Sequence, residues 1–235
     1  MLVRVRDAAA VARAGADAVV QAAQRALHEH GGFRLVLAGG NTPRACYELL
    51  SGELRAEVEW RRVSVFFGDE RCVPPDAAES NYRMARETLL DPLDLRGAAV
   101  RRIAGELPPE TAAADYDAEL RRYWAEGEPM FDLVLLGMGP EGHTASLFPG
   151  SPALEERSRL AVAVEVPATP ASRVTLTPPA FRASRQILFL VSGAEKADAI
   201  ARVFGGESEV PAGAVAALAP SRFLVDEAAA AKVPA

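Results

Sequence analysis

Four short apolar runs, each followed by a polar or glycine-bearing loop, constrain the fold of this chain more than any other feature. The runs are FRLVLA (33–38), VSVFFG (63–68), FDLVLLG (131–137) and QILFLVS (186–192). Short, predominantly apolar runs of this length are typical of parallel strands that are covered on both faces. Because helical patterns alternate with the predicted strands along most of the chain, the sequence predicts an α/β fold: an open, doubly wound, mostly parallel sheet with helices on both faces.

The helical patterns carry start and stop signals. Asp7 can cap a helix that runs to His30, and Gly31 suits the left-handed residue that ends many helices. Thr42 suits the cap and Pro43 the first position of a helix that ends near residue 50. Further helices are predicted over 81–90, 108–125, 195–204 and 211–218, and further strands over 98–103, 160–165, 173–177 and 222–225. The irregular segment 151–172 is expected to cross over the sheet. No linker or repeat divides the chain, so we expect one domain spanning 1–235.

The chain is acidic, with 26 Lys and Arg against 32 Asp and Glu and a formal charge of −6. This balance argues against nucleic acid or an anionic membrane as partner, and an anionic ligand would need a local cluster of cations. No signal peptide and no apolar run of about 20 residues is present, so we expect a cytoplasmic protein. Cys46 and Cys72 lie far apart, as expected of reduced thiols rather than of a disulfide or a zinc site. The oligomeric state is left open, with a monomer slightly favoured.

Two of the loops after predicted strands could bind an anionic ligand. Residues 39–43 (GGNTP) combine glycines with a helix start, which suits a phosphate but equally suits a tight turn with an ordinary cap. In the second loop, Asp69 could accept sugar hydroxyls and Arg71 could clamp a phosphate, although charged residues there could also be merely solvated. Asn81 is expected to belong to a helix start. Since the carboxyl ends of parallel strands share one edge of a sheet, we expect both loops in one crevice.

The third loop carries the best catalytic candidate. Of the three histidines, His28 and His30 lie at a predicted helix C-terminus, where they favour the helix dipole. His143 follows a buried strand in the glycine-rich stretch GMGPEGHT (137–144), and an imidazole titrates near neutrality, as a general base should. Glu141 could orient its ring. No metal site is expected there, and Ser146 lacks the setting of a serine nucleophile.

Taken together, five stretches of the chain resemble the 6-phosphogluconolactonases, in the order found in that family. They are LAGGNTP (37–43), FFGDERCV (66–73) with SNY (80–82), LLGMGPEGHTASLFPG (135–150), SRVTLTPPAF (172–181) and LFLVSGAEKADAI (188–200). The resemblance runs from about residue 7 to the C-terminus. It implies a Rossmann-like fold and the hydrolysis of 6-phosphoglucono-1,5-lactone, a small phosphosugar lactone, to 6-phosphogluconate in the pentose phosphate pathway, with no cofactor and no metal.

The resemblance also implies roles for single residues. His143 would activate the attacking water, and Asp69 would lie beside the sugar ring. The phosphate would be held by Gly39, Gly40, Asn41, Thr42, Arg71 and Lys196, with a contribution from Arg173. The chain departs from the family pattern at Glu141, where the family usually has Asp, and at Asn41, where it often has Ser.

Two alternative functions remain open, a different enzyme and a non-catalytic binding protein. Glucosamine-6-phosphate deaminases resemble this fold, but their histidine is typically followed by an Asn-Glu-Pro triplet, whereas TASLFP follows His143. A non-catalytic phosphosugar sensor would be expected to carry a DNA-binding segment, and residues 1–30 offer one helical pattern with few basic residues.

Overall fold

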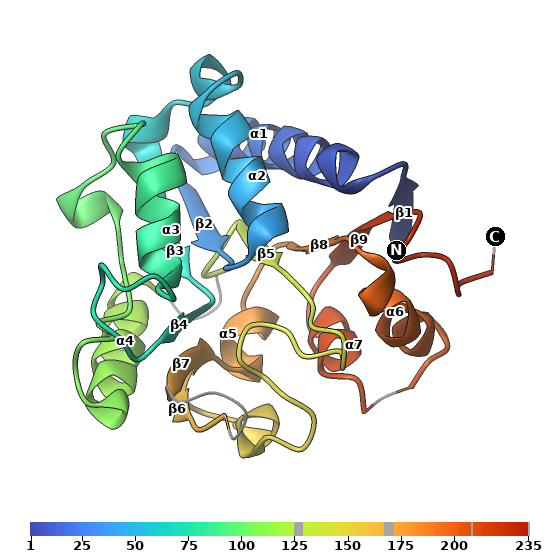
Figure 1. Ribbon diagram of the computed structural model, residues 1–235. Coiled ribbons are helices and arrows are strands. Elements are labelled where there is room, and N and C mark those ends of the chain that lie inside the picture. Colours follow the sequence, from blue (N-terminus) through green and yellow to red (C-terminus); the bar gives the residue numbers. More distant parts are fainter. Residues whose placement is uncertain (125–128, 167–171, 208, 235) are drawn as a thin grey trace.

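The computed structural model describes residues 1–124, 129–166, 172–207 and 209–234. Its main element is a six-stranded parallel sheet (Figure 1), with the spatial order β1-β9-β8-β5-β2-β3. The strands are β1 (Leu2–Val5), β2 (Phe33–Leu37), β3 (Val63–Phe67), β5 (Leu133–Leu136), β8 (Ile187–Val191) and β9 (Ser221–Asp226). The predicted α/β fold is therefore confirmed; β1 was not predicted.

Helices cover both faces of this sheet (Figure 1). Helices α1 (Ala8–His30) and α2 (Asn41–Ser51) pack together on one face, whereas α5 (Pro178–Arg182), α6 (Ala197–Phe204) and α7 (Pro211–Ala216) lie on the other. The predicted caps of α1 are confirmed: the Asp7 side chain accepts a hydrogen bond from the Ala10 N–H, and Gly31 is left-handed with φ +82°.

A second, smaller sheet is antiparallel and was not predicted. It consists of β4 (Asp69–Arg71), β7 (Arg173–Leu176) and β6 (Ala161–Val164), in the order β4-β7-β6, and α4 (Pro109–Tyr123) packs on it. The sequence predicts strands near 160–165 and 173–177, but it predicts a polar loop at residues 69–71. Three charged residues give no strand pattern, and their partner strand lies about a hundred residues away in the sequence.

Other boundaries differ locally from the expectation. Helix α3 spans only Asn81–Ala85 and continues as a wider π-helical turn over Arg86–Leu90. The strand expected over 98–103 is instead a short 3-10 turn (Gly97–Ala99) followed by a single bridge between Val65 and Val100. Further 3-10 turns span Arg55–Glu57, Trp60–Arg62, Pro152–Glu155 and Ala194–Lys196. Residue 125 of the predicted helix 108–125 and residues 167–171 of the expected crossover lie outside the described residues.

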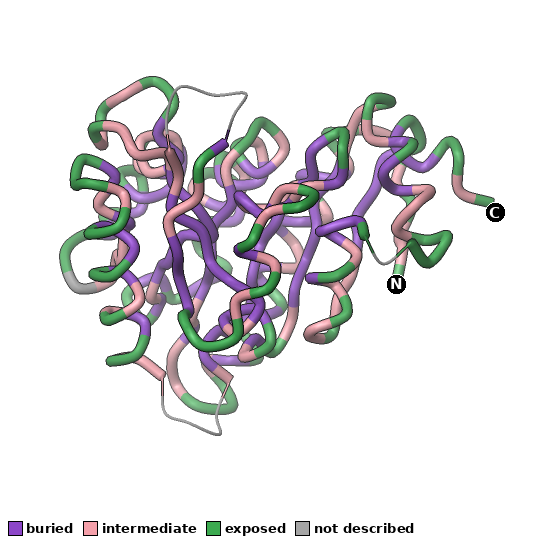
Figure 2. Tube along the Cα trace, turned by 90° about the horizontal axis from the view of Figure 1, so that it is seen from below, coloured by how far each residue is buried: buried purple, intermediate pink, exposed green. Residues whose placement is uncertain are grey.

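The core lies along the central strands (Figure 2). Strands β5 and β8 are buried along their whole length, as the apolar runs predicted. Cys46 is buried and Cys72 half-buried, and both are free thiols. Among the described residues, no helix combines the length and the apolar character that a membrane span requires.

Candidate active site

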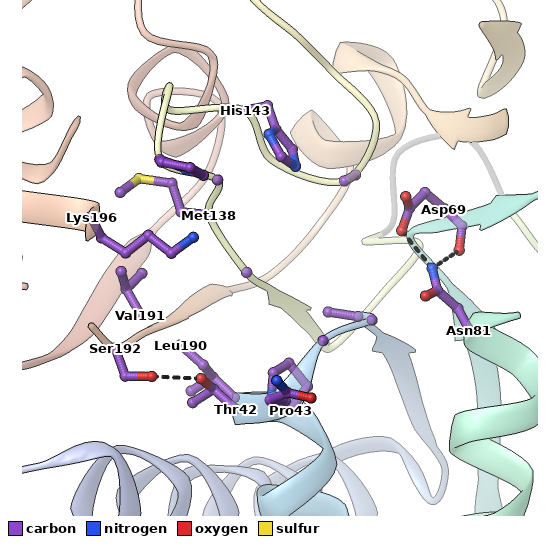
Figure 3. Close-up of a pocket in the computed structure, with 18 of the residues that line it drawn as sticks. Thr42, Pro43, Asp69, Asn81, Met138, His143, Leu190, Val191, Ser192 and Lys196 are labelled. Atoms are coloured by element: carbon purple, nitrogen blue, oxygen red, sulfur yellow. Dashed lines mark hydrogen bonds between the residues drawn. The ribbon is translucent and has the colours of Figure 1, made fainter. Parts of the chain in front are cut away.

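The loops after four neighbouring strands, β8, β5, β2 and β3, meet at the carboxyl edge of the sheet. There they enclose a cleft of about 370 Å³ (Figure 3). The cleft is lined by nine of the ten residues predicted for the site, namely Gly39, Gly40, Asn41, Thr42, Asp69, Arg71, His143, Arg173 and Lys196. Glu141, the tenth, does not line the cleft but contacts the imidazole that does.

The glycine loop leads from β2 into α2. Gly40 precedes the first helical residue with φ +105°, a conformation that favours glycine, and no side chain caps the helix. The first N–H groups of α2 are therefore not satisfied by a capping side chain. The prediction that Thr42 is the cap is wrong, because the helix begins earlier, at Asn41. The Thr42 hydroxyl instead lies 2.7 Å from the Ser192 hydroxyl at the end of β8.

Asp69 begins strand β4, and its carboxylate is buried. Oδ2 accepts a 2.6 Å hydrogen bond from the Ser146 hydroxyl, and Oδ1 accepts one of 3.0 Å from the Asn81 side-chain amide. Gly39 makes room for this arrangement, because a Cβ on it would lie 2.1 Å from the Asn81 amide oxygen. Asn81 thus begins α3, as expected, and also helps to shape the cleft.

Glu70, the next residue of β4, has a structural role outside the cleft. Successive side chains of a strand point to opposite faces, so Glu70 points away from the cleft side of β4. Its buried carboxylate accepts hydrogen bonds from the Asn81 and Tyr82 N–H groups and from the Ser80 hydroxyl, which holds the start of α3. Burial nevertheless raises the pKa of Glu70 above its ordinary value.

Arg71 and Arg173 are direct cross-strand partners in the small sheet. The Nε atom of each is buried and has no hydrogen-bond partner in the described part of the chain. Arg71 also donates through Nη1 to the Glu79 carbonyl, and Arg173 lies 4.0 Å from the Asp69 carboxylate. Burial lowers the pKa of Arg173, a change that Asp69 opposes and Arg71 reinforces. Two neighbouring cations with unused donors make this wall suitable for an anion.

Lys196 supplies a third cation from the opposite side of the cleft. It lies in the turn after β8, and its side chain is mostly buried and extends toward the cleft beside Met138 and Val191 (Figure 3). Its Nζ atom is 3.8 Å from the Glu195 carboxylate, too far for a direct hydrogen bond. Since no residue in the described ranges forms a hydrogen bond with the ammonium group, its donors are available to a ligand.

His143 projects into the cleft from the loop that follows β5 (Figure 3). Its Nδ1 atom lies 2.9 Å from Oε1 of Glu141, although the two groups are not aligned as a hydrogen bond. Gly139 leaves space for this pair, since a Cβ there would lie 2.0 Å from Nδ1. With Nδ1 facing the carboxylate, Nε2 is the nitrogen left for a ligand or water.

Glu141 is exposed to solvent and does not line the cleft. Partial burial raises its pKa, but its own backbone N–H and the neighbouring His143 and Lys196 lower it more, so the net pKa is below the ordinary value. The carboxylate is therefore ionised near neutral pH, and it can hold the ring and stabilise its protonated form.

Two residues of the cleft, Ser192 and Ala145, are not predicted by the sequence. Ser192 fits the end of a strand there, and Ala145 belongs to a family motif without a role of its own. Ala145 has φ +47°, an uncommon conformation for a residue other than glycine. Neither residue type carries a chemical signal in the sequence; only the position of each after a strand could have pointed to it. Within the described ranges, no group of three or more His, Cys, Asp or Glu is placed to hold a metal.

Known proteins resemble this chain in sequence and in fold. The family described as glucosamine-6-phosphate isomerases/6-phosphogluconolactonase matches residues 6–223. A 6-phosphogluconolactonase of Mycobacterium tuberculosis is 42% identical over 236 residues, covering 95% of this chain and 94% of that protein. The structure of a 6-phosphogluconolactonase from Trypanosoma cruzi is 30% identical with a TM-score of 0.87, covering 100% of this chain and 97% of that one. A monomeric glucosamine-6-phosphate deaminase has a TM-score of 0.83 at 20% identity and covers 98% of this chain and 99% of its own, so it shares the fold alone.

Proposed function

Since the chain belongs to the 6-phosphogluconolactonase family, a family of lactone hydrolases within the glucosamine-6-phosphate isomerase superfamily, we propose that His143 activates water in it to hydrolyse 6-phospho-D-glucono-1,5-lactone. The product is 6-phospho-D-gluconate, and the reaction belongs to the oxidative pentose phosphate pathway. One observation carries the proposal: the imidazole, with a carboxylate 2.9 Å from its Nδ1 atom, faces a cleft lined by three cationic side chains.

The phosphate is held by the start of α2 and by the cations around it. The loop from Gly39 to Thr42 offers backbone N–H groups and the positive end of a helix dipole. Lys196, Arg71 and Arg173 supply positive charge to a ligand that carries about −1.5 to −2 near neutral pH. This local cluster explains how a chain of net charge −6 binds an anion.

The chemistry needs one base and one positioned water. Nε2 of His143 takes a proton from water as its oxygen bonds to the lactone carbonyl carbon. The tetrahedral intermediate then collapses, the bond from that carbon to the ring oxygen breaks, and the imidazolium returns the proton to the leaving oxygen. The products are a hydroxyl group and a carboxylic acid, which ionises. A lactone is an activated ester, so neither a nucleophilic side chain nor a metal is required.

Asp69 has the role of positioning the sugar. An ionised carboxylate has about four acceptor sites, of which Ser146 and Asn81 use two. The remaining sites can accept hydrogen bonds from sugar hydroxyls. Asp69 is not needed as a second base, because His143 can serve both proton transfers.

An assay of the purified chain with two substrates tests the reaction. We expect hydrolysis of 6-phosphoglucono-1,5-lactone well above its spontaneous rate, and no ammonia from glucosamine 6-phosphate. Ammonia release without lactone hydrolysis would assign the chain to the deaminases, which share its fold. Binding of 6-phosphogluconate with turnover of neither substrate would instead indicate a phosphosugar sensor.

A further inference from the structure

The phenyl ring of Phe148 stacks on the imidazole of His143. The ring centroids are 4.3 Å apart and the planes are inclined by 28°. The stack follows from a tight turn between the two residues. Thr144 and Leu147 form an antiparallel bridge, closed by a 2.9 Å hydrogen bond from the Leu147 N–H to the Thr144 carbonyl. The residues that flank such a turn are placed side by side, which brings residues 143 and 148 together.

Glu141 and Gly139 contact His143 at the edge of its ring and at its backbone, not at the face of the imidazole. Glu141 lies 2.9 Å from Nδ1, a contact at one edge of the ring that still allows the imidazole to tilt about the line joining the two groups. Gly139 donates its N–H to the His143 carbonyl at 2.9 Å, which holds the backbone but not the ring. Phe148 contacts the face of the imidazole, and a ring packed against that face restricts rotation of the imidazole about the bond that carries it.

Phe148 also contacts the cationic wall of the cleft. The Arg173 guanidinium carbon lies 5.7 Å from the centroid of the phenyl ring, within the range of a cation–π interaction. One half-buried side chain therefore touches both the base and a cation proposed to bind the phosphate. Loss of the ring should disturb the orientation of the base more than the binding of substrate, because Lys196 and the start of α2 do not depend on Phe148.

We propose that Phe148 is a positioning residue for the general base: its ring fixes the plane of the His143 imidazole so that Nε2 faces the cleft. This inference rests on the proposed function, in which His143 is the base. A ring that turns freely would present Nε2 to the water only part of the time, and small errors in placing a base can cost up to about a hundredfold in rate.

Steady-state kinetics of Phe148→Leu and Phe148→Tyr, measured on the full chain, test the proposal. We expect Phe148→Leu to lower kcat by about ten- to a hundredfold with little change in KM, and to alter the pH profile of kcat. Phe148→Tyr keeps the aromatic ring and should retain most of kcat. Phe204→Leu is the matched control, because it removes a ring that packs edge-on against Phe223, away from the cleft, and it should leave kcat unchanged.

Proton NMR of the imidazole supplies a readout independent of activity. The stacked phenyl ring shifts the ring protons of His143 upfield; this shift should be present in wild type and Phe148→Tyr and absent in Phe148→Leu. If Phe148→Leu does not fold, Phe148→Met, which keeps a long apolar side chain without a ring, takes its place. Suppose that the folded non-aromatic variant has the wild-type kcat and pH profile while His143→Ala is inactive. This result would overturn the role of Phe148 and leave the proposed function intact. An active His143→Ala would overturn the proposed function itself.

Discussion

The Ser146 hydroxyl donates a 2.6 Å hydrogen bond to Oδ2 of Asp69, and this buried contact joins the histidine loop to strand β4. The two residues lie 77 positions apart in the sequence. The bond fixes the sugar-facing carboxylate relative to the loop that carries the base. Ser146 is therefore part of the site, although it is not a nucleophile: its hydroxyl is fully buried and already committed to Asp69.

Replacement of Ser146 by alanine should weaken both stability and catalysis. It leaves a buried carboxylate with one donor fewer, which typically costs about 1–3 kcal/mol of unfolding free energy. If the contact also contributes about 1.4 kcal/mol to stabilising the transition state, its loss lowers kcat about tenfold. Thermal unfolding and initial rates of lactone hydrolysis measure the two effects.

Ser184→Ala is the matched control, because Ser184 is also a buried serine and donates to the Ala180 carbonyl at 3.2 Å, outside the cleft. This variant should have a lower free energy of unfolding than wild type and an unchanged kcat. Equal kcat values for the two alanine variants would show that the Asp69–Ser146 contact has no catalytic role.

Gly139 should not tolerate a side chain. An alanine Cβ would lie 2.0 Å from Nδ1 of His143 and 2.6 Å from Oε2 of Glu141, so the imidazole or its carboxylate partner must move. We expect Gly139→Ala to lower kcat by up to about a hundredfold while the fold is kept. Gly32→Ala is the control, because the nearest atom to its Cβ would be 3.8 Å away. Similar kcat values in both variants would contradict the confined geometry of the base.

The pH dependence of kcat should identify Glu141 as a partner of the imidazole rather than as a second group that titrates in the same range. Its lowered pKa keeps the carboxylate charged across the range in which an imidazole titrates. We therefore expect the acid limb of kcat to follow one ionisation in wild type. Glu141→Gln removes the anion that stabilises the imidazolium, so the midpoint of that limb should move to lower pH.

Glu155→Gln makes the same change of charge at an exposed residue paired with Arg157 and should not move the midpoint. An acid limb that is unchanged in Glu141→Gln would show that the 2.9 Å contact with His143 has no electrostatic effect on the base.

Asp132 is predicted to stabilise the fold without affecting catalysis. It precedes β5 at the edge of the sheet opposite the cleft and is buried. It accepts a hydrogen bond from the Arg34 N–H at 2.8 Å and pairs with His30 at 2.9 Å and with Arg185 at 3.3 Å. Asp132→Asn should lower the free energy of unfolding by about 1.5–3 kcal/mol, the range for hydrogen bonds to charged groups.

Asp198→Asn, which breaks an exposed pair with Lys232, should cost less than about 1 kcal/mol. Denaturant unfolding measures both changes. A loss of kcat in folded Asp132→Asn, or equal stability losses in the two variants, would contradict this separation of stability from catalysis.

The main sheet and the meeting point of its loops were predictable, because both follow from local patterns. Apolar runs mark buried strands, and the parallel arrangement places their carboxyl ends at one edge, so the glycine loop and His143 had to approach each other. Asp69 and Arg71 were predicted as site residues for the same reason.

The small sheet and the contacts that it creates could not be predicted from such patterns. Strand β4 has three charged residues and pairs with a strand about a hundred residues away. That pairing sets Arg71 beside Arg173. Likewise, Thr42 looks like a helix cap in the sequence, but its hydroxyl pairs with Ser192, 150 positions away. Contacts between distant residues leave no periodic signal.

The most direct test of the account is kcat for the lactone in His143→Ala, with the spontaneous hydrolysis subtracted. Because the residues proposed to hold the phosphate are unchanged, we expect KM to stay near the wild-type value. The value of kcat should fall by about 10²–10⁴-fold, the usual contribution of a general base. His28→Ala, which removes an exposed imidazole at the end of α1, should have wild-type kinetics. A His143→Ala variant with kcat close to wild type would contradict the role of His143 as the base that activates water.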